Sequence, residues 1–196
     1  MPYCMVIDLK KCVGCNACTT ICKAENGTPP GVTRAKIMRD EVGKYPDVRR
    51  RSIPMLCMHC EDAPCVNICP SAATKKDPAT GVVSIDKERC VGCRACLLAC
   101  PYDARYYRRD EAGYFGELTP FEKVKYADKP KGVVDKCDFC LKNRVEKGLK
   151  PACAENCLAE ARHFGKLEEA RAQIVERRGF QLRPELGTGP SVYYLP

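Results

Sequence analysis

The chain has 196 residues, 17 of them cysteine, and a formal net charge of +8. This length suits one large domain or two small ones, and such a cysteine content signals disulfides or bound metal. An odd cysteine count, in a chain well beyond the ~80 residues of small secreted disulfide scaffolds, argues against disulfides. The sequence has no apolar run of eighteen residues and no charged N-terminal region before an apolar stretch. Neither a membrane span nor an export signal is therefore expected.

The first cysteine motif follows a short strand predicted over residues 6–9, and a helix is predicted to continue through Glu25. The motif has the spacing C-x2-C-x2-C-x3-C and comprises Cys12, Cys15, Cys18 and Cys22. This is the bacterial ferredoxin spacing, in which three thiolates hold one 4Fe-4S cube and the fourth binds the neighbouring cube. Three cysteines in a tight loop can point at three corners of one cube, while the following helix carries the fourth away.

The segment between the first and second motifs contains no cysteine. Residues 32–38 and 50–55 are predicted to pair as a hairpin across the glycine and proline at 43–46. The arginines at 49–51 lie in mid-chain with no apolar segment after them. We interpret them as a solvated or partner-facing surface rather than as a twin-arginine signal.

The second and third motifs are separated by only twenty residues, and each follows a predicted strand, at 52–56 and 82–85. Their cysteines are Cys57, Cys60, Cys65 and Cys69 in the second motif, and Cys90, Cys93, Cys96 and Cys100 in the third. The third motif repeats the Cys-Val-Gly-Cys of the first, which indicates duplicated ferredoxin units. Gly14 and Gly92 occupy the same place in these loops, where a positive φ lets backbone N–H groups turn toward sulfur.

A second cysteine-free insertion runs from residue 102 to 136 and places aromatic side chains among charges. These are Tyr106, Tyr107, Tyr114, Phe115, Phe121 and Tyr126. Aromatic residues interspersed with basic ones can bind single-stranded nucleic acid. We favour a docking surface for another subunit, because such surfaces are enriched in Tyr, Phe and Arg.

The fourth motif is the least specific, because its two cysteine pairs are twelve residues apart. It comprises Cys137, Cys140, Cys153 and Cys157, after a strand predicted at 133–135. Alone it could be a zinc ribbon, although zinc sites rarely use the crowded triplets of the other motifs. Beside three ferredoxin motifs it is interpreted as the fourth cluster site. Cys4 is then left over and is expected to be a buried free thiol.

The C-terminal region is predicted to begin with a basic helix that carries an apolar stripe over 167–174 and ends before Gly179. Residues 180–196, rich in Pro and Gly, are expected to lack regular structure. Their apolar end, 192–195, is expected to pack on this chain or a partner. His59 is predicted to hydrogen-bond rather than to bind iron, because cysteines already supply four ligands for every cube.

The basic charge has an explanation in the clusters themselves. A cube with four thiolates carries roughly two negative charges when oxidised, so four cubes contribute about −8. The loaded protein is then nearly neutral, and no nucleic-acid partner is predicted.

Taken together, the motifs resemble those of the four-cluster (4 × 4Fe-4S) electron-transfer subunit of the dimethyl sulfoxide reductase superfamily of molybdenum/tungsten oxidoreductases, of the polysulfide, thiosulfate and arsenate reductase type. Segments outside the cysteine spacing agree, namely Lys23-Ala-Glu-Asn26, Cys57-Met-His-Cys-Glu61, Pro101-Tyr-Asp-Ala-Arg105 and Leu182-Arg-Pro-Glu185 with Gly187-Thr188. A departure is Leu158, where such subunits often have proline, and this change can alter solvent access at the last cluster.

The resemblance implies partners: a large bis-pterin catalytic subunit and an integral membrane subunit that exchanges electrons with quinone. The chain itself would be non-catalytic and membrane-associated only through its complex, either in the cytoplasm or exported together with its partner. The alternative function is a free-standing polyferredoxin or an iron-sulfur subunit of a hydrogenase or formate dehydrogenase complex.

The expected fold class is α+β: two interleaved bacterial-type two-cluster ferredoxin units with loop and hairpin insertions and an extended C-terminal tail. Unit A comprises 1–30 and 130–165, with motifs I and IV, and unit B comprises 50–108, with motifs II and III. Insertions at 31–49 and 109–129 are expected to contact other subunits, and 166–196 forms the C-terminal helix and tail.

The crossing rule for the fourth cysteine assigns four ligand sets. They are cluster 1, Cys12, Cys15, Cys18 and Cys157; cluster 2, Cys57, Cys60, Cys65 and Cys100; cluster 3, Cys90, Cys93, Cys96 and Cys69; and cluster 4, Cys137, Cys140, Cys153 and Cys22. The sequential alternative, which pairs motif I with II and III with IV, remains open at this point.

Overall fold

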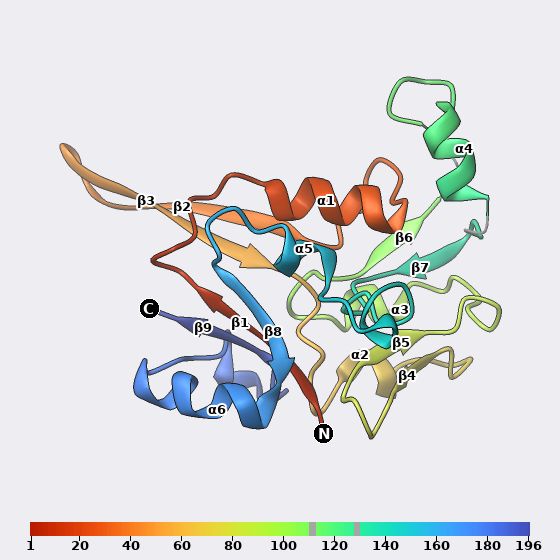
Figure 1. Ribbon diagram of the computed structural model, residues 1–196. Coiled ribbons are helices and arrows are strands. Elements are labelled where there is room, and N and C mark those ends of the chain that lie inside the picture. Colours follow the sequence, from red (N-terminus) through yellow and green to blue (C-terminus); the bar gives the residue numbers. More distant parts are fainter. Residues whose placement is uncertain (110–112, 128–129) are drawn as a thin grey trace.

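The computed structural model describes residues 1–109, 113–127 and 130–196, and it shows small helices mixed with short strands (Figure 1). The helices are α1 (Ala17–Asn26), α2 (Pro64–Asn67), α3 (Ala95–Leu98), α4 (Pro120–Tyr126), α5 (Ala152–Glu155) and α6 (Leu167–Glu176), with 3-10 turns at Val145–Lys147 and Pro184–Leu186. The strands are β1 (Tyr3–Asp8), β2 (Lys36–Lys44), β3 (Asp47–Met55), β4 (Thr74–Lys76), β5 (Val83–Ile85), β6 (Tyr106–Arg108), β7 (Val133–Asp135), β8 (Arg162–Lys166) and β9 (Val192–Leu195). The α+β prediction is confirmed.

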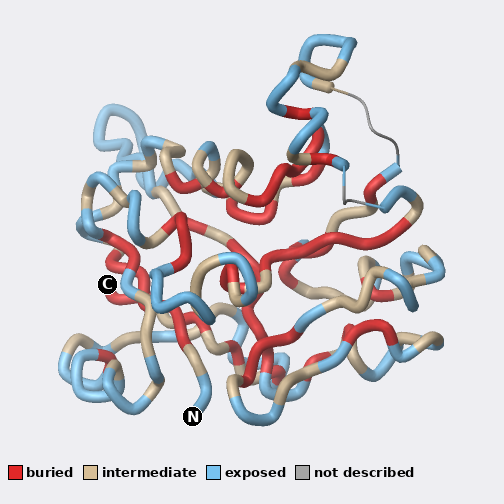
Figure 2. The backbone as a smooth tube through the Cα atoms, turned by 45° about the vertical axis from the view of Figure 1, so that its right-hand side comes forward, coloured by how far each residue is buried: buried red, intermediate tan, exposed pale blue. Residues whose placement is uncertain are grey.

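The only sheet of three strands among the described residues has the order β8-β1-β9. Strand β1 is apolar on both faces because both are covered. Met5 and Ile7 point into the main core, whereas Cys4 and Val6 pack with Ile174 of α6. This alternation follows from the two-residue period of a strand. Figure 2 shows the resulting buried centre beneath an exposed rim.

The expectation that residues 180–196 lack regular structure is wrong at the end of the segment. Prolines and glycines do interrupt it as far as Pro190, but β9 then pairs in parallel with β1. Its residues are β-branched, aromatic and aliphatic, which favours a half-buried strand, and β1 offered a free edge. The expectation that this apolar end packs on the chain is confirmed, since Val192, Tyr194 and Leu195 are fully buried.

The predicted hairpin is confirmed, with strands β2 and β3 longer toward the turn than expected. They pair from Lys36 with Met55 out to Lys44 with Asp47. Figure 1 shows this hairpin extending away from the body of the protein. The arginines at 49–51 are exposed along it, as predicted.

The insertion at 109–129 contains a helix, not only the loop or hairpin that was expected. Helix α4 begins with a capping box, in which Thr119 and Glu122 cap each other's backbone N–H groups, and Pro120 occupies its first turn. This Thr-Pro-x-Glu pattern is a helix-start signal that the sequence analysis overlooked. Residues 110–112 and 128–129 of the predicted insertion lie outside the described residues.

Helix packing relates the cysteine motifs in pairs. Helix α1, which carries the end of motif I, packs against α5 of motif IV, and α2 of motif II packs against α3 of motif III. Two small antiparallel sheets, β4–β5 and β6–β7, lie beside them. Within the described residues, no helix is both long enough and apolar enough to cross a membrane.

Candidate metal centres

The four Cys-x-x-Cys loops share one backbone feature. The residue before the second cysteine has a positive φ in each: +67° at Gly14, +46° at His59, +68° at Gly92 and +56° at Phe139. Only glycine adopts this region without strain. A Cβ on Gly14 would collide with Ser52, and one on Gly92 with the carbonyl oxygen of Gly132. The first and third loops therefore require glycine, whereas the second and fourth accommodate a large ring.

Two cavities are each lined by four cysteines from two different motifs. The first cavity holds three cysteines of motif I and the last of motif IV, namely Cys12, Cys15, Cys18 and Cys157. The second holds three of motif III and the last of motif II, namely Cys90, Cys93, Cys96 and Cys69. In both cavities, the fourth cysteine comes from the motif that the crossing rule designates.

The remaining eight cysteines form two further groups, which are recognised by the mutual effect of their thiols. Burial and, to a smaller extent, the neighbouring Cys153 and Cys140 thiols raise the pKa of Cys22 to about 12. Burial raises the pKa of Cys137 as well, with Cys22 its strongest thiol neighbour. The structure therefore brings Cys22 of motif I to the three cysteines of motif IV.

The last group joins motif II to the end of motif III. Burial and, to a smaller extent, the Cys57, Cys65 and Cys100 thiols raise the pKa of Cys60 to about 12. The Thr188 side chain opposes the increase through a hydrogen bond. All sixteen predicted site residues thus belong to one of four groups, and each group draws on two motifs.

The geometry suits clusters better than single ions. No three His, Cys, Asp or Glu side chains of the described residues converge as closely as the ligands of one metal ion. Instead, the cysteines of the first and third groups surround a cavity. Four thiols spaced around a cavity fit the corners of a 4Fe-4S cube, which Cys thiolates hold.

The four groups differ in their exposure. Cys15 of the first group and Cys93 of the third are exposed, and the loop residues Val13 and Val91 are 72% and 69% exposed. In contrast, the cysteines of motifs II and IV that belong to the second and fourth groups are all buried. The first and third groups therefore lie at the surface, and the other two lie inside.

His59 and Phe139 connect the two inner loops. Their rings stack with centroids 3.8 Å apart, and His59 is fully buried. Burial lowers the pKa of His59 well below its usual value, with Lys136 and Arg105 contributing. The neutral ring accepts a hydrogen bond from the Val83 N–H at Nδ1, over 3.0 Å. The predicted hydrogen-bonding role of this histidine is confirmed.

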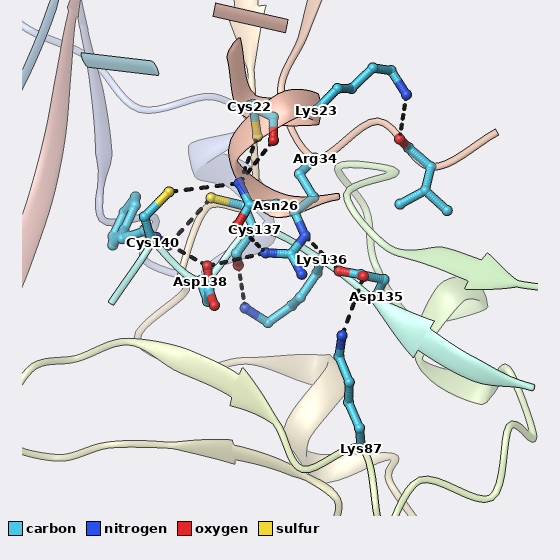
Figure 3. Close-up of polar contacts among 12 residues, drawn as sticks. Cys22, Lys23, Asn26, Arg34, Lys87, Asp135, Lys136, Cys137, Asp138 and Cys140 are labelled. Carbon is cyan, nitrogen blue, oxygen red and sulfur yellow. Dashed lines mark hydrogen bonds and ion pairs between the residues drawn. The ribbon is translucent and has the colours of Figure 1, made fainter. Parts of the chain in front are cut away.

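A polar network that the sequence analysis missed holds the fourth group (Figure 3). Asn26, at the end of α1, donates to the Sγ atoms of Cys22 and Cys140 over 3.5 and 3.8 Å. Arg34 donates to the Asn26 side-chain oxygen over 2.9 Å and pairs with Asp135 over 2.6 Å. The network therefore orients ligands from two motifs. Its one sequence signal was the Lys-Ala-Glu-Asn segment that contributed to the resemblance.

The C-terminal tail closes over the second group. The Glu61 N–H donates to the carbonyl of Gly189 over 2.8 Å, and the Tyr102 and Thr188 hydroxyls share a 2.6 Å hydrogen bond. Separately, Cys4 is 1% exposed, and burial raises the pKa of its thiol to about 11. Cys4 is therefore the buried free thiol that the sequence predicted.

Comparison with known proteins agrees with this geometry. Two families, each described as a 4Fe-4S dicluster domain, match the chain, one over residues 48–115 and 109–167 and the other over 4–70. The chain is an electron-transfer protein with four 4Fe-4S clusters. It belongs to the family of iron-sulfur subunits of the dimethyl sulfoxide reductase superfamily of molybdenum enzymes.

Several curated relatives span nearly the whole chain. A selenate reductase subunit of Mesobacillus selenatarsenatis is 39% identical over 100% of this chain and 72% of its own length. The arsenate respiratory reductase iron-sulfur subunit ArrB of a Shewanella species is 36% identical over 97% of this chain and 94% of its own. A tetrathionate reductase subunit of Salmonella typhimurium is 37% identical over 98% and 72%, respectively.

Proposed function

We propose that this chain relays single electrons between a molybdenum or tungsten bis-pterin catalytic subunit and a quinone-linked membrane subunit or another carrier. The chain itself would be non-catalytic and peripheral to the membrane. Support comes from the relatives, which are named as subunits of selenate, arsenate and tetrathionate reductases. None of these names is that of a polyferredoxin, a hydrogenase or a formate dehydrogenase, so the alternative function is not pursued.

We infer that the four cysteine groups are the ligand sets that the crossing rule predicts. The observation that carries this inference is the cavity in which Cys157 joins three cysteines of motif I. The packing of α1 on α5 and of α2 on α3 supports the same division into unit A and unit B. In each cube, three thiolates would come from one motif and the fourth from its partner.

The groups suggest an order of electron transfer, from cluster 1 to 4 to 2 to 3 or the reverse. The Cys18 thiol of cluster 1 lies near Cys153 of cluster 4, and Cys137 of cluster 4 lies near Cys57 of cluster 2. The His59–Phe139 stack spans this second step. In each step one electron leaves a reduced cluster, which is oxidised, and reduces the next cluster.

We infer that the two insertions dock partners at the two ends of this relay. Arg39 of the hairpin donates to the carbonyl of Gly14, over 2.7 Å, so the hairpin emerges beside the loop of cluster 1. Arg94, in the loop of cluster 3, stacks on Tyr107, which lies two residues before the insertion at 109–129. The hairpin and α4 extend from opposite sides of the protein (Figure 1). A partner bound at either insertion would thus lie near an exposed cluster.

The hairpin turn provides the test, because Tyr45 at its tip is 92% exposed. The complete complex is purified through its catalytic subunit, from cells that carry Tyr45→Asp or Val175→Asp in this chain. Val175 is a matched control, an apolar residue 72% exposed on α6. We expect Tyr45→Asp to lower the amount of this chain that co-purifies while its iron content stays unchanged. Undiminished co-purification of that variant, or an equal loss with the control, would contradict docking by the hairpin.

A further inference from the structure

Two arginines occupy equivalent places after the third and fourth motifs. Arg105 lies five residues after Cys100, and Arg162 lies five residues after Cys157. Arg105 immediately precedes β6, and Arg162 is the first residue of β8. The first and second motifs carry no charged residue at this offset. The pattern therefore assigns one such arginine to each ferredoxin unit.

Both guanidinium groups are buried with few polar partners. Arg105 and Arg162 are 3% and 4% exposed. Arg105 donates from Nη1 to the Thr74 hydroxyl over 3.2 Å, but its Nε and Nη2 find no oxygen or nitrogen acceptor among the residues that the structure describes. Both terminal nitrogens of Arg162 lack one too. A buried cation is costly unless something of opposite charge compensates it.

The compensating groups are thiol sulfurs, and they are equivalent in the two units. Arg105 donates to Thr74, which lines the cavity of the third group together with Cys96. Its electrostatic partners include Cys65 and Cys96, the third cysteines of motifs II and III. Arg162 itself lines the cavity of the first group beside Cys18, and its strand β8 packs against helix α5, which carries Cys153. Its electrostatic partners are likewise Cys18 and Cys153, the third cysteines of motifs I and IV. Each arginine therefore lies between the two cysteine groups of one unit.

We propose that Arg105 and Arg162 are positioning residues, each of which supplies one fixed positive charge shared by the two clusters of its unit. This proposal rests on the ligand sets proposed above. Arg105 serves clusters 2 and 3, and Arg162 serves clusters 1 and 4.

The charge acts on the reduced state. A cluster gains one negative charge when it accepts an electron, so a nearby buried cation stabilises the reduced form and raises the reduction potential. Because each arginine reaches both clusters of its unit, it raises the two reduction potentials together and leaves the difference between them largely unchanged. A guanidinium does not deprotonate in proteins, so this compensating charge is the same before and after the electron moves.

The test is a redox titration of the purified complete complex, monitored by electron paramagnetic resonance, with iron content measured in parallel. We expect Arg105→Gln to lower the potentials of two clusters and Arg162→Gln those of the other two. The expected fall is about tenfold in the reduction equilibrium constant of each affected cluster, which corresponds to about 59 mV for a one-electron couple. Arg105→Lys and Arg162→Lys keep the charge and should restore most of the shift. Arg171→Gln, at an exposed position on α6, should change nothing.

The outcomes separate this proposal from the proposed function. Sixteen irons with all four potentials unchanged would overturn the shared charge and leave the relay intact. Fewer than sixteen irons in the unsubstituted chain would instead refute the four ligand sets. Should a glutamine variant lose iron, we expect the loss to be confined to the two clusters of its unit and reversed by lysine. Loss from the other unit, or no rescue by lysine, would also overturn the proposal.

Discussion

The pairing of motif I with motif IV makes a prediction about intact clusters. Cys22 and Cys137 are far apart in sequence, but their thiols are neighbours, and both are assigned to cluster 4. Cys22→Ala and Cys137→Ala should each leave three intact cubes of four, about twelve irons in cubes at four irons each. Since both changes strike the same cube, the double variant should also keep three.

A second double variant serves as the control for the number of cubes lost. Cys22→Ala combined with Cys90→Ala strikes clusters 4 and 3, and only two intact cubes should remain. Under the sequential pairing, Cys22 would instead complete the cube of motif II. The Cys22/Cys137 double variant would then also keep only two.

The assay is anaerobic iron and sulfide analysis together with spin integration of the reduced 4Fe-4S signals. The number of intact cubes is a valid measure in both cases, whether a damaged cube is lost entirely or persists with three irons. Two intact cubes in the Cys22/Cys137 double variant would refute the reasoning that places motifs I and IV in one unit.

Three further predictions concern stability, which is measured as the temperature at which the visible absorbance of the clusters is lost. Arg34→Met should destabilise by about 3 kcal/mol, because it removes the closest cation from the buried Asp135 carboxylate, whereas Arg51→Met, in an exposed pair, should cost at most about 1 kcal/mol; equal effects would contradict the importance of burial. Gly92→Ala should lower the stability clearly more than Gly116→Ala. Both glycines have a positive φ, which costs an alanine about 1–2 kcal/mol, but of the two only Gly92 would bring its new Cβ against backbone; a smaller loss of stability at Gly92 would refute this collision. Tyr194→Phe should cost about 1 kcal/mol, because its hydroxyl donates to a buried carbonyl of β3, and no loss would show that the bond contributes nothing.

The positions of the four cysteine groups relative to the two insertions suit the proposed relay. The exposed cysteine groups lie at the surface beside the hairpin and beside the residues that flank the second insertion, while the buried groups lie between them. Electrons would enter and leave where partners dock, and the interior steps would be shielded from solvent. The stack of His59 on Phe139 joins the ligand loops of motifs II and IV.

Much of this protein was predictable because cluster ligation is a local property. A tight loop can present three thiolates to one cube only at short spacings, so the motifs can be recognised from the cysteine spacing in the sequence. The same holds for the apolar strand before motif I, predicted at 6–9 and observed at 3–8, for the helix that follows and for the hairpin, because each depends on residues that are close in sequence. Helix α4 was predictable as well, from its capping box, but was overlooked.

The tertiary structure alone decided how distant segments meet. The parallel pairing of β9 with β1 depends on a free strand edge formed at the other end of the chain, and no local pattern encodes that contact. Likewise, Asn26, Arg34 and Asp135 are ordinary polar residues in sequence, and they become a ligand-orienting network only when three separate segments converge. The positions of Arg105 and Arg162 were visible as equal offsets, but not their burial between sulfur groups. Spacing therefore predicted which residues hold clusters, and long-range packing decided which cysteine groups are buried, which are exposed and what charge lies between them.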